Sequence, residues 1–134
     1  MAVEWVRQFC LSLPHTTETV QWGNDLVFKI GGKMFSVLAL EPGPHCMSFK
    51  CTPEEFAELV ERPGIIPAPY LARALWVALE TQDALPTPEI KSLIRQSYDL
   101  VRAKLPKKTI AALENERPKP KRADTRLRSK TALS

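Results

Sequence analysis

The stretch WGNDLVFKIGGKMFSVLALE, residues 22–41, places two adjacent glycines between two apolar runs. Such a pair suits a two-residue hairpin turn, because both central residues of that turn need positive φ angles. With Gly31 and Gly32 as the turn, Phe28 faces Phe35 and Leu26 faces Val37. The predicted core face then carries Leu26, Phe28, Ile30, Phe35, Val37 and Ala39. The opposite face carries Val27, Lys29, Met34, Ser36 and Leu38, and Lys33 lies at the tip.

Outward from the hairpin, the chain alternates helical and extended patterns. Apolar residues recur at helical spacing over 3–13 and over 87–105, and each run ends at a proline. Residues 45–51 alternate as a third strand, and 75–80 can form another. Thr52-Pro53-Glu54-Glu55 is a capping box that begins a helix ending at residue 62, and 64–70 is predicted to be an extended loop. Helices beside an antiparallel meander predict an α+β, two-layer domain, a twisted antiparallel sheet with helices packed on one face.

Positive charge is distributed unevenly along the chain, whose formal net charge is +4. Residues 1–113 contain twelve bases and twelve acids, so they carry no net charge. From residue 114 onward, seven bases stand against three acids in a polar, proline-interrupted sequence. Such a segment can bury little apolar surface. The sequence therefore predicts one folded domain over 1–113 and a basic, disordered tail over 114–134, which would dominate any attraction to nucleic acid.

Few residues have the patterns that catalysis or metal binding requires. Cys10, Cys46 and Cys51 show no C-x-x-C spacing, and a strand would put the last two on opposite faces. His15 and His45 lie beside predicted turns, and neither G-x-S-x-G nor a glycine-rich phosphate loop occurs. We therefore expect no enzyme activity, no metal and no cofactor. Free thiols fit a reducing cytoplasm, and no apolar stretch approaches the ~18 residues of a membrane span.

Aromatic rings and cations near the predicted loops form the candidate binding surface, because rings can stack on bases and cations can hold phosphates. In the folded part these residues are Lys29, Lys33, Arg73, Trp22, Tyr70 and Trp76. In the tail they are Arg117, Lys119, Lys121, Arg122, Arg126, Arg128 and Lys130. The competing interpretation is that Trp22 and Trp76 lie at the rim of the core, as large rings often do.

Five segments, taken together and in order, resemble the MmcQ/YjbR family. They are CLSLP at 10–14, WGNDLVFKIGGKMFSVL at 22–38, SFKCTPEEFAEL at 48–59, GIIPAPYL at 64–71 and LIRQSYDLVRAKLPKK at 93–108. The resemblance covers about residues 3–108 and implies a fold similar to bacterial frataxin. It also implies the family's label of DNA-binding proteins with a double-wing fold, in which the glycine hairpin is one candidate wing. It implies no catalytic residue and no cofactor.

One loop departs from the pattern of that family. After APYL, the family reads close to Asn-Lys-x-His-Trp, whereas this chain has Ala72-Arg73-Ala74-Leu75-Trp76. The cation is kept as Arg73, but two polar positions are occupied by alanine and leucine. Any polar recognition built on that loop is therefore weakened.

Two functions remain open on these patterns. The first is a cytoplasmic, non-enzymatic DNA-binding protein that holds phosphates weakly and with little sequence preference. The second is a small adaptor domain that binds a protein or another ligand on the exposed face of the sheet. The neutral charge of residues 1–113 favours the adaptor, and the family label favours DNA. Cations gathered on one surface would support nucleic acid, and even mixing would support the adaptor. In either case we expect a monomer.

Overall fold

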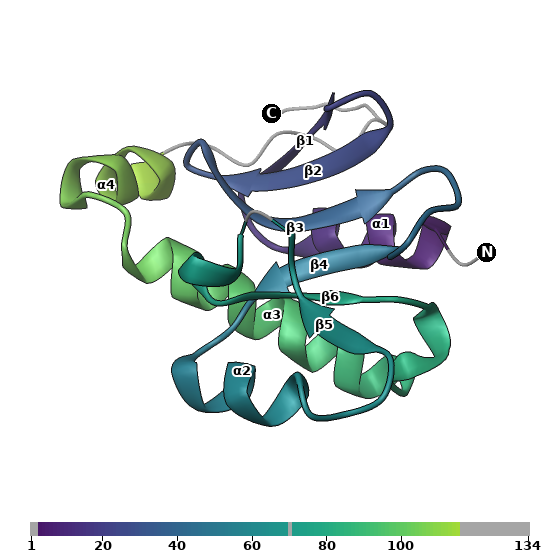
Figure 1. Ribbon diagram of the computed structural model, residues 1–134. Coiled ribbons are helices and arrows are strands. Elements are labelled where there is room, and N and C mark those ends of the chain that lie inside the picture. Colours follow the sequence, from purple (N-terminus) through teal and green to yellow (C-terminus); the bar gives the residue numbers. More distant parts are fainter. Residues whose placement is uncertain (1–2, 70, 116–134) are drawn as a thin grey trace.

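The computed structural model describes residues 3–69 and 71–115, and Tyr70 and the seven tail bases from Arg117 to Lys130 lie outside this range. Six antiparallel strands form one sheet in the order β1-β2-β3-β4-β6-β5 (Figure 1). The strands are β1 (Thr16–Gln21), β2 (Asp25–Ile30), β3 (Lys33–Ala39), β4 (Met47–Lys50), β5 (Ile65–Pro67) and β6 (Trp76–Leu79). The helices are α1 (Val3–Ser12), α2 (Pro53–Leu59), α3 (Thr87–Ala103) and α4 (Lys107–Asn115), with short 3₁₀ turns η1 (Ala72–Ala74) and η2 (Gln82–Ala84).

The helices supply the main core on one face of the sheet, which confirms the predicted α+β class (Figure 1). The ring of Phe35 in β3 meets Tyr98 of α3 edge to face, with 5.3 Å between ring centroids. The Tyr98 hydroxyl donates to the carbonyl of Pro14 at 2.6 Å and so joins α3 to the end of α1. The capping box is present, because Thr52 and Glu55 each accept from the backbone N–H of the other. It sets the point at which α2 leaves the sheet.

The predicted pairing of the glycine hairpin is wrong beyond its tip. Lys29 pairs with Met34 as expected, but Phe28 pairs with Ser36 and Leu26 with Leu38, because the register shifts between Phe28 and Lys29. A β-bulge of this kind inserts one residue into one strand and shifts the alternation beyond it. Val37 therefore faces Val27 and belongs to the second face of the sheet, not to the predicted core face.

The bulge leaves Phe35 and Ser36, which are consecutive, both on the helix side. Phe35 packs on Tyr98, and the Ser36 hydroxyl hydrogen-bonds the thiol of Cys10 in α1. The Ser36 hydroxyl also lies 3.3 Å from the carbonyl of Ser48, to which it donates. A buried polar side chain is tolerated where its hydrogen bonds are satisfied. Beyond the bulge, Ser36 occupies a core position and Val37 lies on the opposite face of the sheet, which is the reverse of the predicted alternation.

The second face of the sheet is buried at its centre without any helix on it. Its cluster consists of Val27, Val37, Ala68, Trp76 and Ala78, with Met34, Ile66 and Leu71 packed against it. Ala68 and Leu71 come from the segment between β5 and β6, so this segment covers that face. The exposed sheet face that the adaptor alternative assumed is therefore absent from this part of the described sheet. Trp76 is only 3% exposed and lies inside this cluster, whereas Trp22, the other ring placed at the rim of the core, is 62% exposed.

Three elements have no counterpart in the sequence prediction. β1 is a polar edge strand, TTETVQ, and β5 contains Pro67, which an edge strand tolerates because its outer N–H groups need no partner. α4 begins directly after Pro106 and continues to Asn115, two residues beyond the predicted boundary at 113. In the portion of the chain that the structure describes, none of the helices has the length and apolar character that a bilayer crossing requires.

Candidate functional site

The tip of the glycine hairpin packs against the junction between α3 and α4. Gly31 has a φ of +59°, and a Cβ at this position would lie only 2.7 Å from Leu105 Cδ1 and 3.1 Å from Thr109 Cγ2. Leu105 itself is 6% exposed. The tip of the hairpin therefore packs against the start of α4 as well as turning the chain. Glycine is needed for this close approach as well as for the turn.

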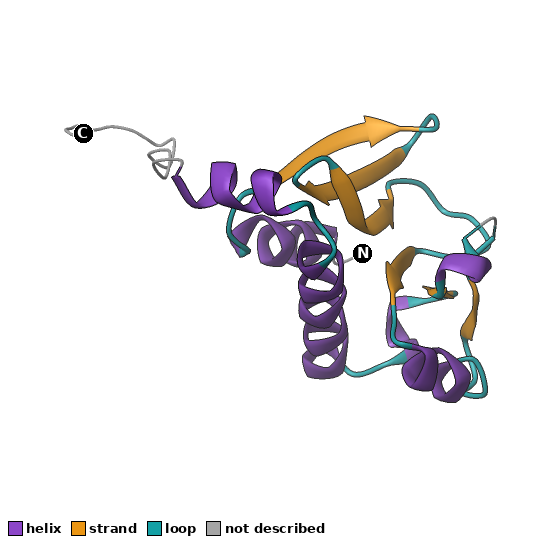
Figure 2. Cartoon of the chain, turned by 90° about the vertical axis from the view of Figure 1, so that its left-hand side faces the viewer, coloured by secondary structure: helices purple, strands orange, loops and turns teal. Residues whose placement is uncertain are grey.

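Six cations lie on elements that begin or end on this side of the domain, and we call them the basic end. They are Lys33, Lys50, Arg73, Lys104, Lys107 and Lys108, from β3, β4, η1, the end of α3 and the start of α4. The ends of these elements lie on the left-hand side of the molecule in Figure 1; Figure 2 looks onto that side and shows α4 at one edge of it and η1 at the other. Half of the twelve bases in residues 1–113 therefore lie at one end of the domain. The cations were not mixed evenly over the surface.

Lys50 links two other parts of the basic end, η1 and the end of α3. The Lys50 ammonium donates to the carbonyl of Ala74 at 2.7 Å, which fixes η1 and with it Arg73 beside the end of β4. The pKa of Lys50 is lowered from its ordinary value, first by burial and second by the positive charge of Lys104. Like charges are thus held near each other at a cost in free energy. Such an arrangement is typical of sites that receive an external anion.

The start of α4 shows the same unfavourable electrostatics. The N-terminus of a helix carries partial positive charge and is normally followed by acids. α4 instead has Lys107 and Lys108 in its first turn and no acid there. Over residues 3–69 and 71–115, no carboxylate oxygen lies within 4.0 Å of the side-chain nitrogens of any of the six cations. These charges are not explained by ion pairs within the described domain.

Cations elsewhere in the domain are used differently. Arg7 pairs with Glu18 at 2.6 Å and Arg62 with Glu89 at 2.7 Å, each through two hydrogen bonds. The pKa of Glu89 is lowered by its hydrogen bond to Arg62. On α3, Arg95 lies 3.7 Å from Asp99 and Arg102 lies 3.0 Å from Glu114. The four paired cations are all arginines, whereas five of the six cations of the basic end are lysines, so the two groups differ in both pairing and residue type. Lys29 and Lys91 also have no ion pair among the described residues.

The structure brings together only some of the residues predicted from the sequence. Lys33 at the tip and Arg73 in η1 are exposed members of the basic end, and Lys29 is half-buried in the middle of the hairpin, on the same sheet face as Val27. Trp22 lies in the β1–β2 turn, at the other end of β2, so the six residues of that strand separate it from the tip by about 20 Å. Trp76 is buried. Among the described residues, neither tryptophan therefore shares a surface with Lys33 and Arg73; Tyr70 lies outside the described range.

Four members of the basic end were missed from the sequence: Lys50, Lys104, Lys107 and Lys108. The run LPKK at 105–108 was the available signal, since two lysines directly after a helix-ending proline are poor partners for a new helix N-terminus. Lys50 could not have been found in this way. It ends a strand, and its neighbours at the basic end are 24 and 54 residues away in sequence.

The three thiols offer no reactive group. Burial raises the pKa of Cys10 and of Cys51 to about 12, and it raises the pKa of Cys46 as well. All three are free and buried. Protonated thiols are poor nucleophiles and poor metal ligands at neutral pH.

Comparison with known proteins gives a family and two structural neighbours. The YjbR family model matches residues 11–100. The chain is similar to a solved Deinococcus radiodurans protein of the DUF419 domain family, at 31% identity and a TM-score of 0.73, over 81% of this chain and 85% of that chain. A solved Pseudomonas syringae protein shares the fold at 23% identity and a TM-score of 0.63, over 75% of this chain and 98% of that chain. A comparison with curated proteins gave no match.

Proposed function

The chain belongs to the YjbR family, and from that premise we propose that its basic end binds the phosphate backbone of DNA. One observation supports the proposal above the others: six cations from five elements lie on the side of the domain that holds the hairpin tip, without carboxylate partners among the described residues. Binding of phosphates releases condensed counterions from the duplex, and this release supplies most of the affinity of non-specific complexes. The hairpin then acts as a wing whose tip contributes Lys33.

The chemistry of these residues favours weak binding with little sequence preference. Lysine ammonium groups act as point charges on phosphate, whereas sequence is read by groups that reach base edges. Around Arg73 the side chains are Ala72, Ala74 and Leu75, which can neither donate to nor accept from a base. Trp76 is buried and cannot stack on a base without rearrangement of the second cluster. Phosphate contacts therefore make up the proposed interface.

The proposed function is non-enzymatic and belongs to the cytoplasm. Three free thiols support a reducing compartment, and their raised pKa values argue against thiolate catalysis. The bases of the tail would add further phosphate contacts to those of the folded domain. Their share can be measured separately with a chain that ends at Asn115, the last residue of α4.

A pair of matched double variants tests the proposal. Binding of the full chain to a fluorescein-labelled duplex of about 20 base pairs is measured by fluorescence anisotropy. We expect K33Q/K107Q to weaken binding roughly tenfold at 0.1 M salt, because two phosphate contacts are lost. The control K91Q/R95Q removes the same charge from α3, where Arg95 pairs with Asp99 and Lys91 lies over the Trp5 ring, and should change binding less than twofold. Equal losses in both variants would show that only net charge matters and would refute an interface at the basic end.

A further inference from the structure

The large apolar side chains that the described residues leave exposed gather at the other end of the sheet. Val20 is 56% exposed, Trp22 62% and Leu40 39%. Val20 lies near the end of β1, Trp22 in the turn to β2, and Leu40 directly after β3. The Leu40 N–H donates to the carbonyl of Asn24 at 2.9 Å, which holds the two loops side by side. An exposed apolar group of this kind marks an interaction surface when it has a polar rim.

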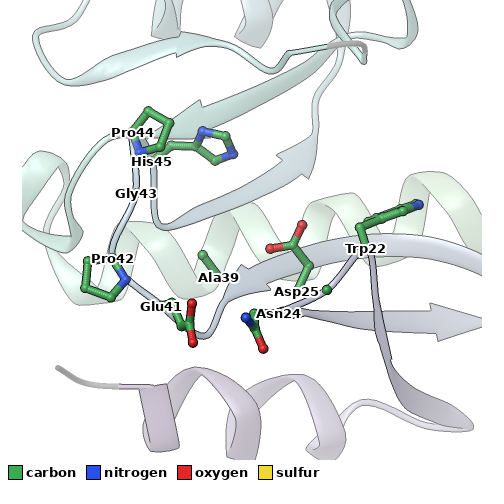
Figure 3. Close-up of a pocket in the computed structure, with 10 residues that line it drawn as sticks. Trp22, Asn24, Asp25, Ala39, Glu41, Pro42, Gly43, Pro44 and His45 are labelled. Atoms are coloured by element: carbon green, nitrogen blue, oxygen red, sulfur yellow. The ribbon is translucent and has the colours of Figure 1, made fainter.

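A hollow of about 320 Å³ lies between these two loops (Figure 3). One wall is the turn Trp22-Gly23-Asn24 with Asp25, and the other is the segment from Glu41 to His45. The side chains of Asp25 and His45 point into the space between the loops, and the indole of Trp22 extends outward from the rim (Figure 3). We call Val20, Trp22, Asp25, Leu40, Glu41 and His45 the turn end. Its volume lies at the lower end of the range for ligand pockets, about 300–1,000 Å³, and is large enough for one long side chain.

The polar groups of the hollow favour a cation. Within the described part of the chain, no lysine, arginine or histidine nitrogen lies within 4.0 Å of the carboxylate of Asp25 or Glu41. The His45 Nδ1 is enclosed there and has no hydrogen-bond partner among the described residues. A guest with several N–H donors would satisfy the two carboxylates, and both lysine and arginine provide such donors.

The backbone at Trp22 supports a role in binding. Its φ is +51°, in the left-handed region that bulky residues seldom adopt. Burial of the ring does not compensate for this conformation, since the ring is 62% exposed. Strained residues of this kind cluster at binding sites, where the strain positions a functional group. Tryptophan is also among the residues that contribute most to protein interfaces.

We propose that the turn end docks a segment of a partner protein in which a lysine or arginine stands beside an apolar residue. The cationic side chain enters the hollow between Asp25 and Glu41, and the apolar neighbour packs on Trp22, Val20 and Leu40. Charge complementarity selects this occupant, because the carboxylates lack partners within the described domain. The site lies a strand's length from the basic end, so both surfaces can be occupied at once.

The test uses ¹⁵N-labelled full-length protein and short peptide probes. Acetyl-Leu-Arg-Leu-amide should cause saturable shifts of the Trp22 indole N–H and of the amides of Gly23 and Gly43. The variant D25N/E41Q should weaken this binding at least fivefold, whereas the control E58Q/E61Q, with the same charge change at exposed positions on α2 and in the turn after it, should leave it unchanged. The spectra themselves report whether each variant is folded.

Three results would overturn the proposal. The first is the absence of shifts at millimolar concentrations of the arginine peptide. The second is an equal response to acetyl-Leu-Glu-Leu-amide, which would remove the role of the carboxylates. The third is equally tight binding of n-butylguanidinium alone, which would mean that the hollow takes a free cation and that the apolar residues dock nothing.

Discussion

The two ends of the sheet are built from the same strands and have opposite chemistry. At the basic end, β2 and β3 turn through two glycines beneath α4, and six cations lie without carboxylate partners in the described domain. At the turn end, β1 and β2 turn through Trp22, and the unpaired charges are the carboxylates of Asp25 and Glu41. The zero net charge of residues 1–113 thus conceals six cations at one end and two carboxylates without described partners at the other. Net charge alone says little about which partners a domain attracts, since binding depends on the local field.

The ends differ in packing as well as in charge. The tip of the basic end is fixed by Leu105, which is buried against Gly31. The turn end keeps its largest side chain in solvent, at 62% exposure, whereas Trp76, at the start of β6, is 3% exposed. Two tryptophans that look alike in the sequence therefore have different roles: one stabilises the second face of the sheet, and the other is available for contact.

The largest expected effect concerns the core that both ends share. Phe35→Ala removes the ring that packs on Tyr98 and should lower the free energy of unfolding by about 3–5 kcal/mol. Urea denaturation measures this change. Because both ends are formed by the same strands, the variant should weaken DNA binding and peptide binding in proportion to its unfolded fraction. A loss below about 1 kcal/mol would mean that the bulge does not place Phe35 in the core.

A pH-dependent effect is expected from one buried thiol on the helix side of the sheet, that of Cys51. The pKa of Cys51, near the basic end of β4, is raised to about 12 in the folded chain from 9.0, so the folded state holds a proton that the unfolded state releases. Its contribution to stability is complete below pH 9 and decreases as the pH rises toward 12. As the pH rises from 9 to 10, the free energy of unfolding of the variant Cys51→Ala should fall by about 1 kcal/mol less than that of the parent protein. Identical pH dependence in the two proteins would contradict the burial of this thiol.

The two glycines of the hairpin allow the backbone requirement of the turn to be tested separately from the contact of the turn with Leu105. Gly31→Ala introduces a Cβ 2.7 Å from Leu105 at a positive φ, and it should destabilise the protein by about 2 kcal/mol. Gly32→Ala has the same backbone requirement, with φ at +82°, but meets nothing within 4 Å, so it should cost only about 1 kcal/mol. Thermal unfolding of both variants measures the difference. Equal effects would mean that the tip does not press on α4.

The smallest effect is expected at the turn end. Trp22→Gly removes an exposed ring and relieves a left-handed φ of +51°, so stability should stay within about 0.5 kcal/mol or increase slightly. Differential scanning calorimetry measures the change. The matched variant Trp76→Ala, at a buried position, should instead cost about 3–5 kcal/mol. A large loss at Trp22 would show that its ring supports the fold and would weaken the docking proposal.

Much of the fold followed from the sequence because its determinants are local. Helix periodicity, the capping box at Thr52 and the glycine turn each depend on residues a few positions apart, and each is present. The register of the hairpin did not follow, because a bulge at Phe35 depends on how that ring and Ser36 meet α3 and α1. β1 was missed because edge strands need not carry an apolar pattern.

The candidate site was predictable only in part, since it is an assembly of distant residues. Lys33 and Arg73 were identified because they flank recognisable turns. Lys50 and Lys104 acquire their proximity only when β4 and the end of α3 meet. The sequence also suggested that rings and cations would act together, whereas β2 places Trp22 at the far end and the second cluster encloses Trp76. Whether rings and cations meet depends on the end of the sheet at which each residue lies, and sequence patterns do not indicate that.

The salt dependence of DNA binding tests the central claim most directly, that the folded domain itself binds phosphates through its basic end. The measurement is a salt titration of fluorescence anisotropy for a chain that ends at Asn115, the last residue of α4, and for the same chain with K33Q, R73Q, K104Q and K107Q. We predict a log–log slope of about −3 to −5 for the first protein, since six contacts set a limit near −5, and a slope between about −2 and 0 for the second. No binding by the chain ending at Asn115, with binding retained by the full chain, would assign all affinity to the tail and contradict the account.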